Sequence, residues 1–134
     1  KQYETNVRTP KQDKINQIAT ALGVSPEVLV APRNNPGEDM QTAALRELEE
    51  ETGYKAGKCE FLLSIRTTVA FCNERIDIFL AEDLVKGEQE LDEDEYVDIV
   101  EYSLDELLAM IDEGKIQDSK TICALLAYYR RRNA

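Results

Sequence analysis

The chain has 134 residues, of which 43% are hydrophobic, so its length and composition predict a single domain with a buried core. Its 16 basic and 27 acidic residues give a net charge of −11, and so acidic a body repels the phosphates of nucleic acids and membrane surfaces. A bound phosphate group therefore requires a divalent cation that reverses the local charge.

Three cysteines and the absence of histidine limit the chemistry that the chain can carry. Cys59, Cys72 and Cys123 are odd in number and widely spaced, which argues against a disulfide framework and against a zinc site. No apolar run approaches the roughly 20 residues that a membrane-spanning helix needs, and residues 1–10 lack the apolar core of a signal peptide. We therefore expect a cytoplasmic protein with no membrane partner.

Residues 1–36 differ from the rest of the chain, because their five basic and three acidic side chains give +2 and leave −13 for the remainder. Between residues 11 and 22 the apolar side chains recur at helical spacing. Ser25 then fits an N-cap, with Pro26 at the first position of a second helix. We predict a helical amino-terminal segment over 1–36 that is not an independent domain, followed by one domain over 37–134.

Residues 9–30 also resemble a fragment of the helix-turn-helix of phage repressors, with Ala19, Gly23 and Leu29 at the characteristic spacing. The fragment has fewer helices than a repressor domain and would offer Glu27, not an arginine, to the major groove. Binding to nucleic acid is therefore not expected. We predict instead that the helical pair covers an exposed face of a sheet or docks on a second copy of the chain, which would give a homodimer.

After a connector rich in proline and asparagine, turn signals divide the chain into helices and strands. Gly53 ends the first of these helices, and a capping box of Ser103 and Glu106 begins another. The basic run at 130–132 closes the last helix against its negative dipole end. The predicted elements are helices over 39–52, after Ser103 and from near Asp118, and strands over 59–70, 74–82 and 96–103.

The helix over 39–52 concentrates glutamates in its second half, at Glu47, Glu49, Glu50 and Glu51. On a helical wheel Glu47 and Glu51 lie about 40 degrees apart, so like charges stack at a cost of roughly 0.2–0.5 kcal/mol. Carboxylates at one-turn spacing are hard oxygen ligands, which suit Mg²⁺ or Mn²⁺. The alternative is a solvated acidic face, which is what most charge runs form.

The order of the residues around these glutamates favours the metal site. Glu38 lies eight positions before Arg46, and the run from Arg46 to Tyr54 reads R-E-L-E-E-E-T-G-Y. This arrangement resembles the signature of the Nudix hydrolases, whose second half it matches at every specified position. The resemblance implies a loop-helix-loop that binds divalent cations and hydrolyses a nucleoside diphosphate linked to another group.

The resemblance also implies roles for individual residues. Glu47 and Glu51 would be the principal metal ligands, whereas Glu50 would be a further ligand or a shared partner. Glu38 would add a ligand from the preceding loop. Arg46 would join the catalytic residues by orienting rather than by binding metal, because it can reach Glu50 one helical turn away. The implied cofactor is Mg²⁺ or Mn²⁺.

Residues 37–130 are similar to ADP-ribose pyrophosphatases in the sequence of their strands, acidic loop and capped helix. In that branch the base that activates water comes from the acidic loop, which implies Glu93 and, as second choice, Glu95. The implied fold is α/β, with a mixed sheet between helices. The implied substrate is a small nucleotide diphosphate such as ADP-ribose, which would be cleaved to AMP and a sugar phosphate.

Three departures from the family pattern support an alternative. Pro32 stands where the signature has glycine, and Val69 stands where ADP-ribose enzymes often have proline. The strands that precede the motif in Nudix domains are missing from the predicted elements, as in a truncated, recombined or chimeric chain. The alternative function is a catalytically incompetent Nudix-like scaffold with a structural or oligomerising role. A third hypothesis is a DNA-binding regulator with a Nudix-like sensor half.

Overall fold

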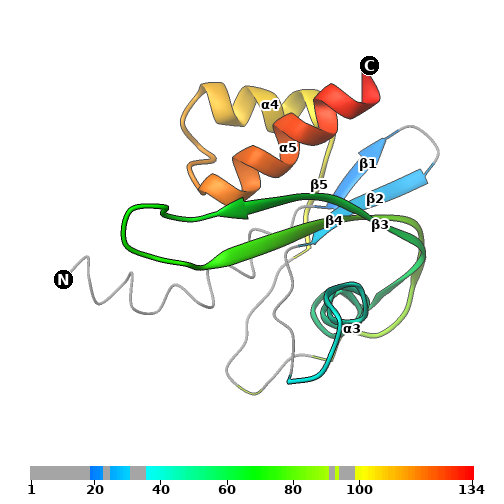
Figure 1. The fold of residues 1–134 in the computed structure, drawn as a ribbon. Coiled ribbons are helices and arrows are strands. Elements are labelled where there is room, and N and C mark those ends of the chain that lie inside the picture. The colour runs from blue at the N-terminus through cyan, green and yellow to red at the C-terminus, as the bar shows by residue number, and fades with distance from the viewer. Residues whose placement is uncertain (1–18, 23–24, 31–35, 91–92, 94–98) are drawn as a thin grey trace.

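The computed structural model describes residues 19–22, 25–30, 36–90, 93 and 99–134 (Figure 1). A single sheet lies between helices, with α3 on one face and the pair α4 and α5 on the other. The elements are β1 (Ala19–Leu22), β2 (Ser25–Val30), α3 (Met40–Thr52), β3 (Tyr54–Arg66), β4 (Arg75–Lys86), β5 (Glu101–Tyr102), α4 (Leu104–Asp112) and α5 (Ser119–Arg132).

The sheet has the strand order β3-β4-β2-β1-β5. All neighbouring pairs are antiparallel except β1 and β5, which are parallel. Strands β3 and β4 form a long hairpin that extends past the helices, and its register shifts between Phe61 and Leu63 at a bulge (Figure 1). Strand β3 lies at one edge of the sheet and begins directly after α3. The carboxyl end of α3 is therefore held at this edge.

Strand β4 supplies apolar side chains to both sides of the sheet. The run 77–81 is buried at every position, which is typical of a strand that is covered on both faces. Ile78 and Leu80 pack into the cluster under α4 and α5, whereas Phe79 and Ala81 pack with α3. Strand β4 therefore links α3 to the rest of the core through the sheet.

The prediction of a helical amino-terminal segment is wrong for the part of it that the structure describes. Residues 19–22 and 25–30 are β1 and β2, which pair with each other. Strand β2 also pairs with β4, and this contact between distant residues overrides the local helical spacing. Pro26 is tolerated because the register with β4 covers only Val28–Val30, so one side of β2 is unpaired at the proline within the described strands.

The same two strands overturn two further expectations. The helix-turn-helix resemblance over 9–30 does not hold for residues 19–22 and 25–30, which are extended, and the DNA-binding hypothesis loses this basis. Strands do precede the glutamate-rich helix, so the expected absence of amino-terminal strands is also wrong. Residues 1–18 and Pro32 lie outside the described residues.

The other predicted elements are confirmed with shifted ends. Helix α3 is capped at its carboxyl end by Gly53, as predicted, and its N-cap is Asp39. The capping box of Ser103 and Glu106 begins α4, and the N-cap Asp118 begins α5. Strands β3 and β4 are displaced by a few residues from the predicted ranges. Of the strand predicted over 96–103, the described part contains β5.

The three cysteines are free thiols, in agreement with the prediction from their number and spacing. Cys72 is exposed, and Cys59 and Cys123 are partly buried. Within the described ranges, no helix combines the length and the apolar character that crossing a bilayer would need.

Candidate functional site

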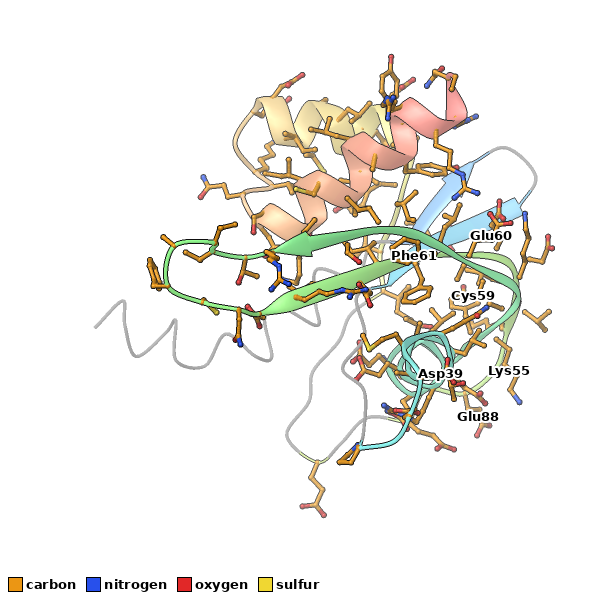
Figure 2. All side chains as sticks on the ribbon, viewed as in Figure 1. Asp39, Lys55, Cys59, Glu60, Phe61 and Glu88 are labelled. Carbon is orange, nitrogen blue, oxygen red and sulfur yellow. The ribbon has the colours of Figure 1, made fainter. Side chains whose placement is uncertain are left out.

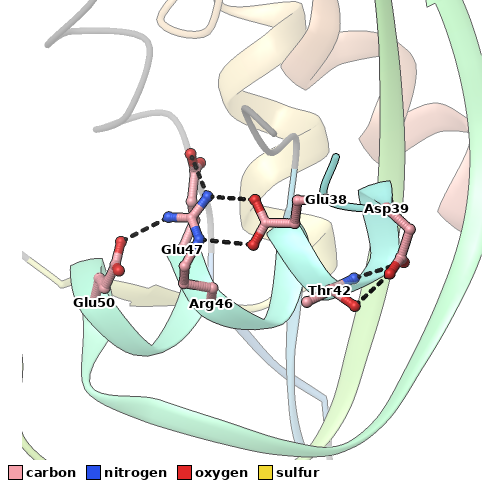
Figure 3. A network of polar contacts seen from close by, with 6 residues as sticks. All are labelled: Glu38, Asp39, Thr42, Arg46, Glu47 and Glu50. Carbon is pink, nitrogen blue, oxygen red and sulfur yellow. Dashed lines mark hydrogen bonds and ion pairs between the residues drawn. The ribbon is translucent and has the colours of Figure 1, made fainter. Parts of the chain in front are cut away.

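The glutamate-rich helix begins with a well-formed cap. The Asp39 carboxylate accepts hydrogen bonds from the Thr42 backbone N–H at 3.0 Å and from the Thr42 hydroxyl at 2.5 Å (Figure 3). The hydroxyl and the N–H lower the pKa of Asp39, because both favour its charged form. The cap fixes the loop just before α3, and Glu38 lies in that loop.

Two of the predicted metal ligands are buried. Glu47 is 6% exposed and Glu51 is 1% exposed, although they lie one turn apart on the same side of α3. A carboxylate that loses its water shell needs compensation from hydrogen bonds, cations or metal. The solvated acidic face is therefore wrong for Glu47 and Glu51. It describes Glu49 better, since that side chain is 49% exposed and pairs with Lys55 at 3.2 Å.

Arg46 links three of the predicted metal ligands (Figure 3). Its Nε and Nη2 donate to the two Glu38 oxygens at 2.9 and 3.0 Å, which is a bidentate contact. Its Nη1 donates to Glu50 Oε2 at 2.9 Å, as the spacing of four residues predicted. Glu47 Oε1 lies 3.9 Å from Nη2. Hydrogen bonding to Glu38 above all, and then the charge of Glu50, raises the pKa of Arg46 and keeps it cationic.

The chain returns to the carboxyl end of α3 directly after β4. Gly87 N–H donates to Gly53 carbonyl at 2.7 Å, and Glu90 N–H donates to Glu50 carbonyl at 2.8 Å. Between them, the Gln89 side-chain amide donates to the Glu51 carbonyl. In Figure 2, Glu88 lies on the same side of α3 as Lys55. Sequence reasoning missed the bond between Gln89 and Glu51, because these residues are 38 positions apart and follow no local pattern.

The predicted bases belong to the acidic loop that follows. Glu93 is exposed and lies in a turn, three residues after the anchored Glu90. Glu95 lies outside the described residues. The structure thus brings the start of the acidic loop to α3, while the roles of both bases stay predictions.

The donor set of the site suits a hard divalent cation, since it consists of carboxylates from one helix and its preceding loop. Within the described residues, however, no three carboxylate or other ligand side chains are close enough together to hold a metal ion. Arg46 holds Glu38 and Glu50 instead. A carboxylate has about four lone-pair sites on its two oxygens, so the bonds to Arg46 do not use up its capacity to bind a cation.

A second polar cluster lies between β3 and β4. Asp77 is 9% exposed and accepts hydrogen bonds from the Ser64 hydroxyl and from Arg75, whose Nε is 2.8 Å away. Burial opposes ionisation of this carboxyl, but Ser64 and Arg75 together lower its pKa. The cluster therefore fixes the register of the hairpin with a buried charge.

A cavity of about 300 Å³ lies on the other face of the sheet from α3. Leu80 and Tyr128 line its floor, and the ion pairs that Glu60 makes with Lys58 and Arg131 border it. Because none of the predicted site residues lines this cavity, it is separate from the candidate site.

Comparison with known proteins agrees with the motif on α3. The family model for the NUDIX domain matches residues 23–125. The chain is 43% identical over 113 residues to a methanol dehydrogenase activator of Bacillus methanolicus, which covers 83% of this chain and 61% of that protein. It is 41% identical over 91 residues to an ADP-ribose pyrophosphatase of Bacillus subtilis (strain 168), which covers 66% of this chain and 49% of that protein.

Among solved structures, the crystal structure of an ADP compounds hydrolase has the same fold, with a TM-score of 0.69 at 21% sequence identity. The similarity covers 85% of this chain and 69% of that chain, and it confirms the predicted mixed sheet between helices. The chain spans about half to three fifths of the length of the two curated relatives. Since the NUDIX match extends over most of the sequence, from β2 to α5, the chain belongs to the Nudix family.

Proposed function

We propose that the protein hydrolyses a nucleoside diphosphate linked to another moiety, with ADP-ribose or a similar nucleotide sugar as substrate and AMP and a sugar phosphate as products. The observation that carries this proposal is the burial of Glu47 and Glu51 one turn apart on a helix with the family motif. Buried ionisable groups with specific charge partners are enriched at functional sites. The family match and the pyrophosphatase relative support the same reaction.

The proposed cofactor is Mg²⁺ or Mn²⁺. Glu47 and Glu51 would hold it from α3, and Glu50 and Glu38 would complete the carboxylate set. When bound, a divalent cation would neutralise the diphosphate and the charge that develops as the bond to the leaving oxygen breaks. Arg46 orients Glu38 and Glu50 by the hydrogen bonds described above.

In the proposed reaction, Glu93 accepts a proton from the attacking water, with Glu95 as the second candidate. The water oxygen forms a new bond to one phosphorus in line with the bridging oxygen, and that oxygen leaves with the second phosphate. A loop carboxylate suits this task because carboxylates that bind metal are weak bases. Glu93 is exposed in a turn and follows by three residues Glu90, whose N–H donates to the Glu50 carbonyl of α3, and this supports the role.

The test is release of AMP from ADP-ribose, with other nucleotide sugars in the same panel, with and without Mg²⁺. Glu51→Gln is expected to lower turnover by on the order of 100-fold, because it removes a ligand charge from the site. Glu49→Gln is the matched control on the same helix, and its exposed, Lys55-paired side chain predicts near-normal turnover. Turnover that responds neither to Mg²⁺ nor to Glu51→Gln would refute the proposal.

A second candidate function is activation of a methanol dehydrogenase, which the 43% identity to the activator supports. A methanol dehydrogenase assayed with and without the protein would test it. If Glu51→Gln activates as well as the unmodified protein does, the effect is that of a non-catalytic scaffold. If the variant fails to activate while Glu49→Gln succeeds, activation depends on the proposed hydrolysis.

We also propose that the protein forms a homodimer, because β3 and β5 end the described sheet with open edges and the hairpin tip exposes apolar side chains. Val69 is 84% exposed and Phe71 is 88% exposed. The mass in solution, measured by light scattering after gel filtration, tests this. A mass of one chain at concentrations on the order of 100 μM would refute it.

A further inference from the structure

The carboxyl end of α3 is capped from a distant part of the chain. The last carbonyls of any helix lack partners within the helix and must find them elsewhere. In α3, the Glu50 carbonyl accepts from the backbone of Glu90, and the Glu51 carbonyl accepts from the side chain of Gln89. These partners come from the residues that follow β4, so the residues that cap the helix are also those from which the acidic loop begins.

Two glycines allow the backbones to meet. Gly53 has φ of +75°, in the left-handed region, and a Cβ there would lie 2.8 Å from the Gln89 nitrogen. A Cβ at Gly87 would lie 2.8 Å from the Gly53 carbonyl oxygen. Both contacts are with backbone atoms, which cannot give way by a rotamer change. We call Gly53, Gly87, Gln89 and Glu90 the α3 junction.

We propose that Gln89 is a positioning residue that, by anchoring the chain at Gln89 and Glu90 to the carboxyl end of α3, sets where Glu93 can lie relative to the metal-binding glutamates. The inference rests on the proposed function. Glu51 would then serve both sides, since its carboxylate would bind the cation while its carbonyl binds Gln89. Glu93 follows Glu90 by three residues, so its Cα stays within about 11 Å of the anchored position.

Gln89 is the member of the junction that substitution can test most cleanly. Its side chain makes the bond to Glu51, whereas Gly87 and Glu90 use backbone N–H groups, which only proline removes, and proline would also restrain the backbone. Gln89 is also exposed, so a change there does not open the core. Gln89→Met keeps the length of the side chain and removes the donor.

A matched control exists elsewhere in the chain. The Gln117 side-chain amide also donates to a backbone carbonyl, that of Gly114, at 3.0 Å in the turn between α4 and α5. Gln117→Met therefore makes the same chemical change away from α3. Any effect of losing a single amide-to-carbonyl bond as such will be seen in both variants.

The first readout is hydrogen exchange of the Glu90 amide, measured by NMR, which needs neither metal nor turnover. Gln89→Met is expected to speed this exchange about fivefold, because the loop loses the net contribution of one hydrogen bond. Gln117→Met should leave it unchanged. Equal exchange rates in the unmodified protein and in Gln89→Met would overturn the proposal, whether or not the protein is a hydrolase.

The second readout is kinetic. Gln89→Met is expected to lower kcat at least about tenfold with KM for ADP-ribose unchanged, because the loop base is displaced while substrate contacts remain. In a Glu93→Gln background the same change should have less than about a twofold effect, since it acts through Glu93. A full tenfold loss in that background, or an equal loss in Gln117→Met, would overturn the positioning role.

Gly87→Ala provides an independent variant, because its methyl group would collide with the Gly53 carbonyl and push the loop away. It is expected to reproduce the faster Glu90 exchange and the loss of kcat at constant KM. An unchanged kcat together with faster exchange in both variants would overturn the proposal. If the unmodified protein releases no AMP at all, the proposed function fails, and the exchange data alone then decide whether the junction is held by Gln89.

Discussion

Arg46 is the cation that pairs with Glu38 and Glu50, two of the carboxylates of the candidate site. It bonds Glu38 with two donors and Glu50 with a third, and all of these bonds depend on the planar geometry of the guanidinium group. A lysine can keep the charge but cannot reproduce the bidentate contact. Arg46 therefore orients the two carboxylates in addition to neutralising their charge.

Arg46→Lys is expected to lower turnover about 10- to 100-fold and to raise the Mg²⁺ concentration needed for half-maximal rate, because Glu38 and Glu50 lose their common anchor. The measurement is a Mg²⁺ titration of AMP release. Arg131→Lys is the control, since Arg131 pairs with Glu60 at the other face of the sheet. Equal titration curves for all three proteins would show that Arg46 has no orienting role.

Asp77→Asn tests the buried charge between β3 and β4. The pKa of Asp77 is lowered in the folded protein, so its contribution to stability is present above the unfolded pKa near 3.8 and is lost as the pH falls through the lower folded value. We expect the variant to be about 1–2 kcal/mol less stable at pH 7 and closer to the unmodified protein near pH 3. Urea unfolding at both pH values measures this, and a difference that is larger at low pH would contradict it.

At the residue scale, the sequence predicted contacts between neighbours in the chain. The Arg46–Glu50 bond follows from helical spacing alone. The bonds of Gln89 to Glu51 and of Ser64 to Asp77 connect different elements, so no local rule could find them. The burial of Glu51 was also unforeseen, because the wheel shows which side a residue faces but not what covers it.

The start of helix α4 is determined by residues close together in the sequence. The Ser103 side chain accepts from the Glu106 N–H, and the Glu106 carboxylate accepts from the Ser103 N–H at 2.7 Å. Both bonds are local, and this is why the capping box was readable from the sequence. The buried Leu104 and Leu107 then seat the helix on the sheet.

Ser103→Ala is expected to lower the free energy of unfolding by about 0.5–2 kcal/mol, because it leaves the Glu106 N–H without its cap. AMP release below the unfolding transition should be unchanged, since α4 and α3 cover opposite faces of the sheet. Chemical denaturation and the turnover assay give the two numbers. A loss of turnover without a loss of stability would contradict this separation of the two faces.

At the scale of elements, the sequence predicted a helix correctly where residues at the ends of the helix mark its boundary. Gly53 at the end of α3 and the capping box of α4 were visible in the sequence, and the start of α5 was predicted near Asp118, which is its N-cap. Strands β1 and β2 were mistaken for helices because their short apolar patterns fit either period, and pairing with β4 and β5 decided between them. Pairing between strands that are distant in the sequence cannot be predicted from the residues of one element alone.

For the whole molecule, the net charge of −11 and the buried acids of α3 have a common consequence. Like charges repel in the folded state, and a cation bound at α3 would relieve the repulsion where it is strongest. The acidic composition therefore fits a protein that meets its anionic substrate through metal. This links the overall charge to the arrangement of four carboxylates.

The central claim is that these carboxylates bind a divalent cation, and direct Mn²⁺ binding tests it without any substrate. Free Mn²⁺ can be followed by electron paramagnetic resonance as the unmodified protein, Glu51→Gln and Glu49→Gln are titrated. The account predicts that the unmodified protein and Glu49→Gln deplete free Mn²⁺, whereas Glu51→Gln binds at least about tenfold more weakly. Equal binding by all three proteins, or none by the unmodified protein, would contradict it.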